Sequence, residues 1–139
     1  MEPRELDDEL YGRIMALTDS GNARSDAGRH REALADFESA LALIPEPIED
    51  WEASTWVLTA LGDCCFLLGD YEGALGHLER ALDCPDIPGS EFLMLRLGQV
   101  LYETGDEAGA KEVLAQAWKI GGKELFEGED GKYLALARS

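Results

Sequence analysis

The side chains of this chain that could carry out chemistry are three cysteines, two histidines and many carboxylates. Cys64 and Cys65 are adjacent, Cys84 precedes a proline, and the only histidines are His30 and His77. An odd number of cysteines without a regular spacing does not predict a disulfide scaffold. We interpret the adjacent cysteines as small buried hydrophobic residues, and a redox or metal role is the alternative.

The carboxylates carry little information, because the chain has 29 Asp and Glu residues. Runs such as Asp7-Asp8-Glu9 and Glu49-Asp50 are expected by chance at this composition. The sequence contains no phosphate-binding loop, no nucleophile elbow and no metal-ligand spacing of histidines. We therefore predict a protein that is not an enzyme, with no cofactor and no metal site.

The net charge is −17, from 29 acidic and 12 basic residues. Such a charge repels nucleic acid and anionic membranes and favours a basic partner. Its simplest explanation is that most acids cover solvated helix faces. The chain has no apolar run near the roughly 20 residues of a membrane span, and its acidic start does not resemble a signal peptide. These features predict a cytoplasmic protein.

The elements that would position these side chains are helices, and residues 58–81 show the pattern most clearly. Two apolar stripes at helical spacing are separated by a turn at Gly69-Asp70. Small residues recur there at intervals of seven, five and seven, and the same intervals occur in two other parts of the chain. The three sets are Gly21, Gly28, Ala33 and Ala40; Gly62, Gly69, Ala74 and Ala81; and Gly98, Gly105, Ala110 and Ala117. Glycine inside a helix is about 0.5–1 kcal/mol less favourable than alanine, so its use suggests that a second helix approaches closely.

This pattern resembles the tetratricopeptide repeat (TPR) family, whose repeats are helical hairpins of 34 residues. Besides the small residues, the resemblance rests on Leu17, Phe37 and Pro45 in repeat 1, Leu58, Leu61, Tyr71 and Leu78 in repeat 2, and Met94, Leu97 and Leu114 in repeat 3. It implies an all-α fold, an α-solenoid of three helix-turn-helix repeats with a C-terminal capping helix. Departures from the family pattern are Ser20, Arg24, Cys65, Leu101 and Gly122.

We expect a single domain over residues 1–139. Repeat 1 spans about 14–47, repeat 2 about 55–88, repeat 3 about 91–124, and a cap covers about 125–139. The interval from Gly21 to Gly62 is 41 residues, seven more than the period. We interpret the surplus, IEDWEAS, as an extension of the third helix back to Ile48; an inserted loop is the alternative.

In stacked repeats the first helix of each hairpin lines a groove, and large aromatic residues on that face are typical of peptide-anchoring sites. The groove residues predicted here are Asn22, Trp56, Thr59, Asp63, Phe66, Phe92, Arg96, Gln99 and Tyr102. The alternative is that Trp56 and Phe92 pack against neighbouring helices. Some family members bind chaperone carboxylates through Lys, Asn and Arg. Only Asn22 and Arg96 match that set, so this chain does not resemble a carboxylate clamp.

The expected function is therefore an adaptor that binds a protein or peptide, with a basic partner favoured. The segments WEASTWVLTALGD and KELFEGEDGKYLALA also resemble small, stand-alone bacterial members of the family, some of them associated with toxin–immunity systems. That resemblance implies an alternative: an immunity-type or chaperone-type protein holding one basic partner, a toxin or a secreted protein. Self-association through the repeat ends is a third expectation.

Overall fold

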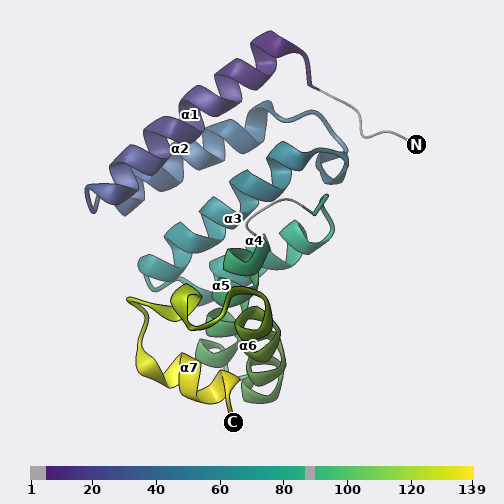
Figure 1. Cartoon of the computed structure of the whole chain (residues 1–139). Helices are drawn as coiled ribbons and strands as arrows, with labels where there is room; N and C mark the ends of the chain where they lie inside the picture. Colours follow the sequence, from purple (N-terminus) through teal and green to yellow (C-terminus); the bar gives the residue numbers. More distant parts are fainter. Residues whose placement is uncertain (1–5, 87–89) are drawn as a thin grey trace. The chain divides into compact units, whose positions relative to one another are not determined.

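The structure is a computed structural model that describes residues 6–86 and 90–139 (Figure 1). Every regular element within these residues is helical, which confirms the all-α helical-repeat fold class. The elements are α1 (Asp8–Asp26), α2 (His30–Leu43), the 3-10 turn η1 (Ile48–Asp50), α3 (Glu52–Leu67), α4 (Tyr71–Leu82), α5 (Ser90–Glu103), α6 (Glu107–Gly121), the 3-10 turn η2 (Lys123–Phe126) and α7 (Gly131–Ala137).

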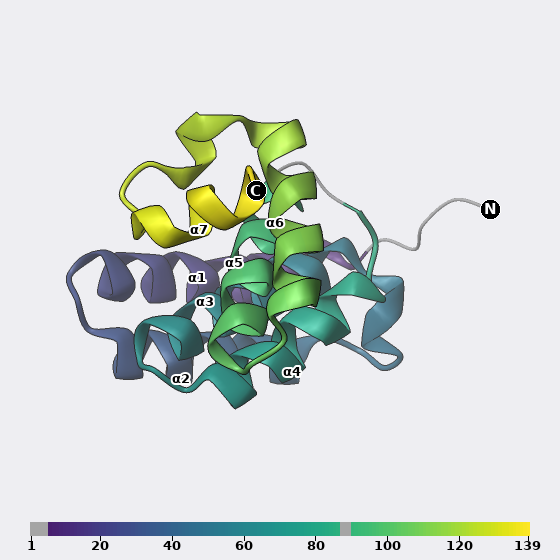
Figure 2. The same cartoon turned by 90° about the horizontal axis from the view of Figure 1, so that it is seen from below.

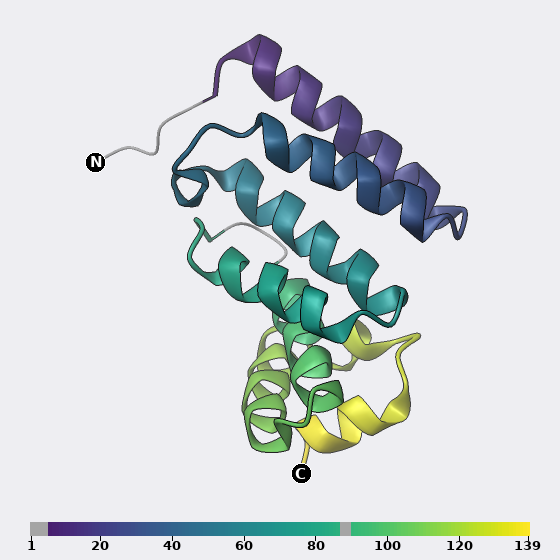
Figure 3. The same cartoon turned by 180° about the vertical axis from the view of Figure 1, so that it is seen from behind.

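The chain divides into two compact units, residues 1–87 and 88–139. In unit 1, the helices α1, α2, α3 and α4 pack in chain order, each against the next (Figure 3). In unit 2, α5 and α6 form a hairpin, and the segment with η2 and α7 folds back against α6 (Figure 2). The tail thus buries Phe126 and Tyr133 within unit 2.

A glycine on the first helix of each hairpin lies directly against a large side chain on the second helix. A Cβ atom added at Gly62 would be 2.4 Å from Cδ2 of Leu78, far inside van der Waals contact. The equivalent shortest distances are 2.6 Å from Gly21 to Phe37 and 2.5 Å from Gly98 to Leu114. The close helix approach predicted from the repeated glycines is therefore confirmed in all three hairpins.

The turn between the two helices of a hairpin also repeats. Gly69 and Gly105 have φ values of 82° and 100°, which L side chains rarely adopt. The next residue, Asp70 or Asp106, caps the following helix, because its carboxylate accepts a hydrogen bond from the backbone N–H three residues later. The turn chemistry therefore sets where α4 and α6 begin.

The third helix begins at Glu52, four residues later than the sequence predicts. Trp51 has an extended backbone, with φ −117° and ψ 135°, and separates α3 from η1. Its indole N–H donates to the carbonyl oxygen of Pro45 at 2.8 Å. Ile48 and Trp51 are both buried, so the surplus residues form a compact turn that buries its own apolar side chains.

We predict that Gly62→Ala destabilises unit 1 by about 1–3 kcal/mol, because the added methyl group overlaps the buried side chain of Leu78. Urea denaturation followed by circular dichroism measures the change. The matched control is Gly76→Ala on α4, where an added Cβ atom meets nothing within 4 Å. That substitution should stabilise the helix by about 0.5–1 kcal/mol. Equal effects of the two substitutions would contradict the close-approach explanation.

Candidate functional site

The candidate site in unit 1 is one face of α3, formed by Trp56, Thr59, Asp63 and Phe66. All four side chains are half-buried, whereas Leu58 and Leu61 on the packing side of the same helix are fully buried. The hydroxyl of Thr59 donates to the carbonyl oxygen of Thr55 at 2.7 Å, so this polar group is satisfied within the helix. α3 thus separates a packing side from a partly exposed aromatic and polar side.

The aromatic side chains of this face differ in their surroundings. The Phe66 ring packs against Tyr71, with 5.7 Å between the ring centroids. The indole N–H of Trp56 makes no hydrogen bond to any residue within 6–86 or 90–139. Asn22, the site residue predicted on α1, is exposed. Unit 1 therefore offers a solvent-accessible tryptophan as the main candidate anchor.

The predicted site residues of unit 2 lie on α5, and the chain's own tail contacts three of them, Arg96, Gln99 and Tyr102. Glu129 Oε1 accepts hydrogen bonds from Nη1 of Arg96 at 2.5 Å and from Nε2 of Gln99 at 2.7 Å. Arg96 also donates to Oε1 of Gln99, and its guanidinium lies 5.0 Å from the ring centroid of Phe92. Arg96 is 6% exposed and Gln99 is fully buried. A carboxylate of the tail thus compensates the buried arginine charge.

A second group of contacts fixes the tail one turn further along α5. The rings of Tyr102 and Tyr133 meet edge to face, with centroids 6.0 Å apart. The Tyr133 hydroxyl donates to Oε1 of Glu103 at 2.6 Å, and Nζ of Lys132 lies 2.9 Å from the same oxygen. The hydrogen bond from Tyr133, followed by the one from Lys132, lowers the pKa of Glu103 below its usual value. The carboxylate therefore stays charged and holds the tail.

The predicted site residues thus have two environments. The side chains of unit 1 are partly or fully open to solvent, whereas Arg96, Gln99 and Tyr102 on α5 contact Glu129 or Tyr133 of the tail. Glu129 could not be recognised from the sequence, because one glutamate among 29 acidic residues gives no signal. Tyr133 lies within the cap expected over residues 125–139, and the hydrogen bond of its hydroxyl depends on the folded tail.

The cysteines lack the environment of reactive thiols. Cys64 and Cys65 are buried and are not bonded to each other, as expected for small hydrophobic residues. Burial raises the pKa of both thiols to about 11, so both are uncharged at neutral pH. Within residues 6–86 and 90–139, no group of three or more His, Cys, Asp or Glu side chains is arranged to hold a metal ion.

The stacked hairpins and their glycine contacts define a helical-repeat protein, a class that acts in protein–protein interactions. The sequence model of the family described as tetratricopeptide repeat matches residues 12–85, more than half of the chain. The chain belongs to the tetratricopeptide repeat family.

A solved structure supports the same fold. It is the C-terminal TPR-containing domain of a Plasmodium falciparum protein assigned to the FK506-binding proteins. It matches with a TM-score of 0.74 and 17% sequence identity, over 96% of this chain and 89% of that chain. No curated protein matches the chain at a significant level. None of the helices within the described residues is long and apolar enough to cross a membrane.

We predict that Glu129→Ala destabilises unit 2 by about 2 kcal/mol, because it leaves the buried Arg96 without its carboxylate. Hydrogen exchange of backbone amides in α5 and α7 measures this loss locally. The control is Glu127→Ala, which removes an exposed carboxylate from the same tail. If exchange becomes faster to the same extent in both variants, the stability of unit 2 depends on the charge of the tail in general and not on the contact between Glu129 and Arg96.

We also predict that acid weakens the attachment of the tail through Glu103. Because folding lowers the pKa of this carboxyl from its usual 4.5, its contribution to stability is present above pH 4.5 and is lost as the pH falls through the lower, folded value. Glu103→Gln should therefore destabilise unit 2 at pH 7, and the difference from the unmodified protein should shrink toward pH 3. Urea denaturation at a series of pH values tests this. A difference that is constant with pH would contradict it.

Proposed function

We propose that this protein is a non-catalytic adaptor that binds a basic protein or peptide through the first-helix face of its repeats. The observation that carries the proposal is the half-buried Trp56, whose N–H has no hydrogen-bond partner among the described residues. Tryptophan combines a large apolar ring with one hydrogen-bond donor, and it is enriched among the residues that dominate binding energy. A partner backbone carbonyl would satisfy this donor.

The neighbours of Trp56 support a basic partner. Asp63 places a carboxylate two turns along the same face of α3, and Phe66 adds a second aromatic ring beyond it. The net charge of −17 attracts basic molecules over long range and speeds their encounter with the protein. In this proposal Trp56 anchors the partner, Asp63 pairs with a basic side chain, and Thr59, Phe66 and Asn22 complete the contact in unit 1.

The α5 residues take part differently. Arg96, Gln99 and Tyr102 would become fully available to a partner only after the tail leaves them, because Glu129 and Tyr133 contact them in the folded unit. Phe92 is half-buried and lies beside the guanidinium of Arg96. Substitution of Arg96 would therefore disturb the fold of unit 2 and would report on binding only indirectly. For this reason Trp56 is the better probe of the proposal.

The acidic charge equally supports the alternative, an immunity-type or chaperone-type protein with one dedicated toxin or secreted partner. Affinity separates the two functions. A dedicated inhibitor should have a dissociation constant near the nanomolar range or below, whereas an adaptor should bind more weakly. For both functions we propose a protein of the cytoplasm. Light scattering at two protein concentrations would detect self-association, which is the third expectation.

We predict that Trp56→Ala weakens binding of the physiological partner by about tenfold or more, because it removes the aromatic anchor. The partner would be captured from the native source, identified by mass spectrometry, and its affinity measured by titration calorimetry. Circular dichroism should show an unchanged helical signal. The control is Leu82→Ala, which truncates an exposed apolar side chain of α4 in the same unit. If Trp56→Ala binds as tightly as the control, the α3 face is not the binding site.

A further inference from the structure

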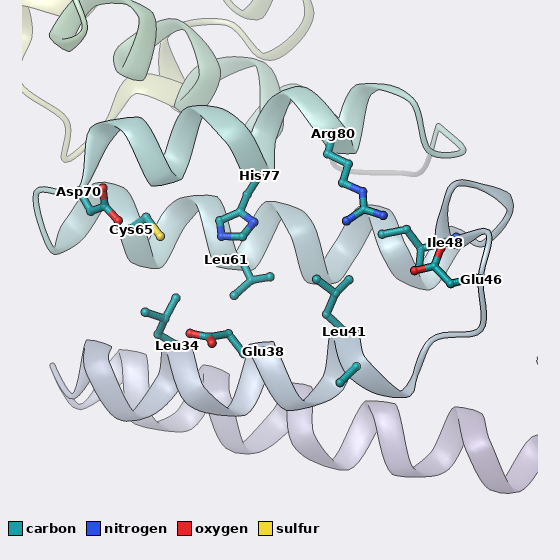
Figure 4. A pocket seen from close by; sticks show the side chains of 11 residues that line it. Leu34, Glu38, Leu41, Glu46, Ile48, Leu61, Cys65, Asp70, His77 and Arg80 are labelled. Atoms are coloured by element: carbon teal, nitrogen blue, oxygen red, sulfur yellow. Dashed lines mark hydrogen bonds between the residues drawn. The ribbon is translucent and has the colours of Figure 1, made fainter.

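A second surface of unit 1 is hollowed, on the side of α3 that does not carry Trp56. A pocket of about 550 Å³ lies between α2, α3 and α4 (Figure 4). Its residues are Leu34, Glu38, Leu41, Ala42, Glu46, Ile48, Leu61, Cys65, Asp70, His77 and Arg80. The volume lies within the range of pockets that bind small molecules or single side chains.

The floor of the pocket is apolar. Leu61 and Cys65 of α3 are buried beneath it, and Leu34 and Leu41 project from α2 along its wall (Figure 4). Figure 4 shows His77 of α4 pointing between these walls toward Leu61 and Glu38. An aliphatic group that enters the pocket would therefore leave water and contact carbon on the floor and on the α2 wall.

The surplus turn of this chain closes one end of the pocket. Ile48, the first of the seven surplus residues, and Glu46, two residues before it, line that end. Arg80 of α4 forms an ion pair with Glu49 at 3.2 Å, which joins the turn to the opposite wall. The pocket thus depends on the departure from a regular repeat spacing.

The charges around the pocket are unbalanced. Glu38, Glu46 and Asp70 line it, whereas its one arginine, Arg80, is already paired with Glu49. Glu38 has no ion-pair partner among the residues that the structure describes. His77 is half-buried, and desolvation lowers the pKa of its imidazole more than Glu38 and Asp70 raise it. The neutral ring therefore adds no positive charge beside Glu38 and Asp70.

We propose that this pocket binds the side chain of an arginine or lysine from a basic segment of a partner protein. The aliphatic stem would lie over Leu61, Leu34 and Leu41, and the cationic head would reach Glu38 and Asp70. Long basic side chains bury their stems along apolar surface in this way, and a guanidinium pairs with carboxylates through several donors. The site is separate from the Trp56 face, so either surface can fail its test without the other.

The experiment uses butylguanidinium, which has the stem and head of an arginine side chain, titrated into the ¹⁵N-labelled full chain. We expect saturable changes of amide chemical shifts in α2 and α4 around Glu38 and His77. Methylguanidinium, which lacks the stem, and butanol, which lacks the charge, should bind more weakly. These comparisons separate the pocket from general attraction of cations to an acidic protein.

Matched variants then test the carboxylates. Glu38→Gln and Asp70→Asn should each weaken butylguanidinium binding about three- to fivefold, the range of a partly exposed ion pair. Asparagine retains the helix-capping role of Asp70, so α4 should remain folded. The control Glu79→Gln removes one exposed charge from α4 outside the pocket and should leave the affinity unchanged.

Three results would overturn the proposal: no saturable shifts, equal affinity in Glu38→Gln and the control, or shifts confined to the Trp56 face. Shifts confined to the Trp56 face would leave the proposed adaptor function intact, because the cation would then bind at α3 rather than in the pocket. Loss of partner binding in Trp56→Ala with an intact response of the pocket to butylguanidinium would instead support both surfaces separately.

Discussion

The contact between a glycine and a large apolar side chain sixteen residues later determines how each hairpin of this protein closes. Because Gly62 has no side chain, Leu78 can occupy the space where a Cβ atom would lie, and the two helices approach closely. Ala74 and Ala81 are fully or almost fully buried on the same second helix, so small side chains keep this approach along the hairpin. Once this face is buried, the opposite side of the first helix remains for other contacts.

Equivalent positions on the first helix of a repeat have different surroundings in the two units. Trp56, Asp63 and Phe66 stand at the same distances from Gly62 as Phe92, Gln99 and Tyr102 stand from Gly98. In unit 1 these side chains are partly open to solvent, whereas in unit 2 the tail contacts Gln99 through Glu129 and Tyr102 through Tyr133. The tail therefore shows, within the chain itself, how a segment with a carboxylate and an aromatic ring binds a first-helix face.

The regular parts of the fold could be predicted from the sequence, because local signals define them. The turn expected at Gly69-Asp70 is where α4 begins, since Gly69 has a positive φ and Asp70 caps the helix that follows. The start of α3 could not be predicted. IEDWEAS contains good helix formers and no helix breaker, and the extended backbone of Trp51 is stabilised by burial and by a hydrogen bond from its indole to Pro45. These contacts exist only in the folded hairpin, so tertiary structure overrides helix propensity here.

Function in this chain is therefore best sought where it departs from its own repeat. A fold match at 17% identity shows that a very different sequence can adopt the same fold, so the fold alone does not define the function. The surplus turn builds one end of the pocket beside Glu38, and the tail places Glu129 against Arg96. Arg80, the one arginine among the residues that line the pocket, is paired with Glu49. The two proposals therefore require the same basic chemistry of a partner through different contacts: an aromatic anchor at the Trp56 face, and carboxylates around an apolar floor at the pocket.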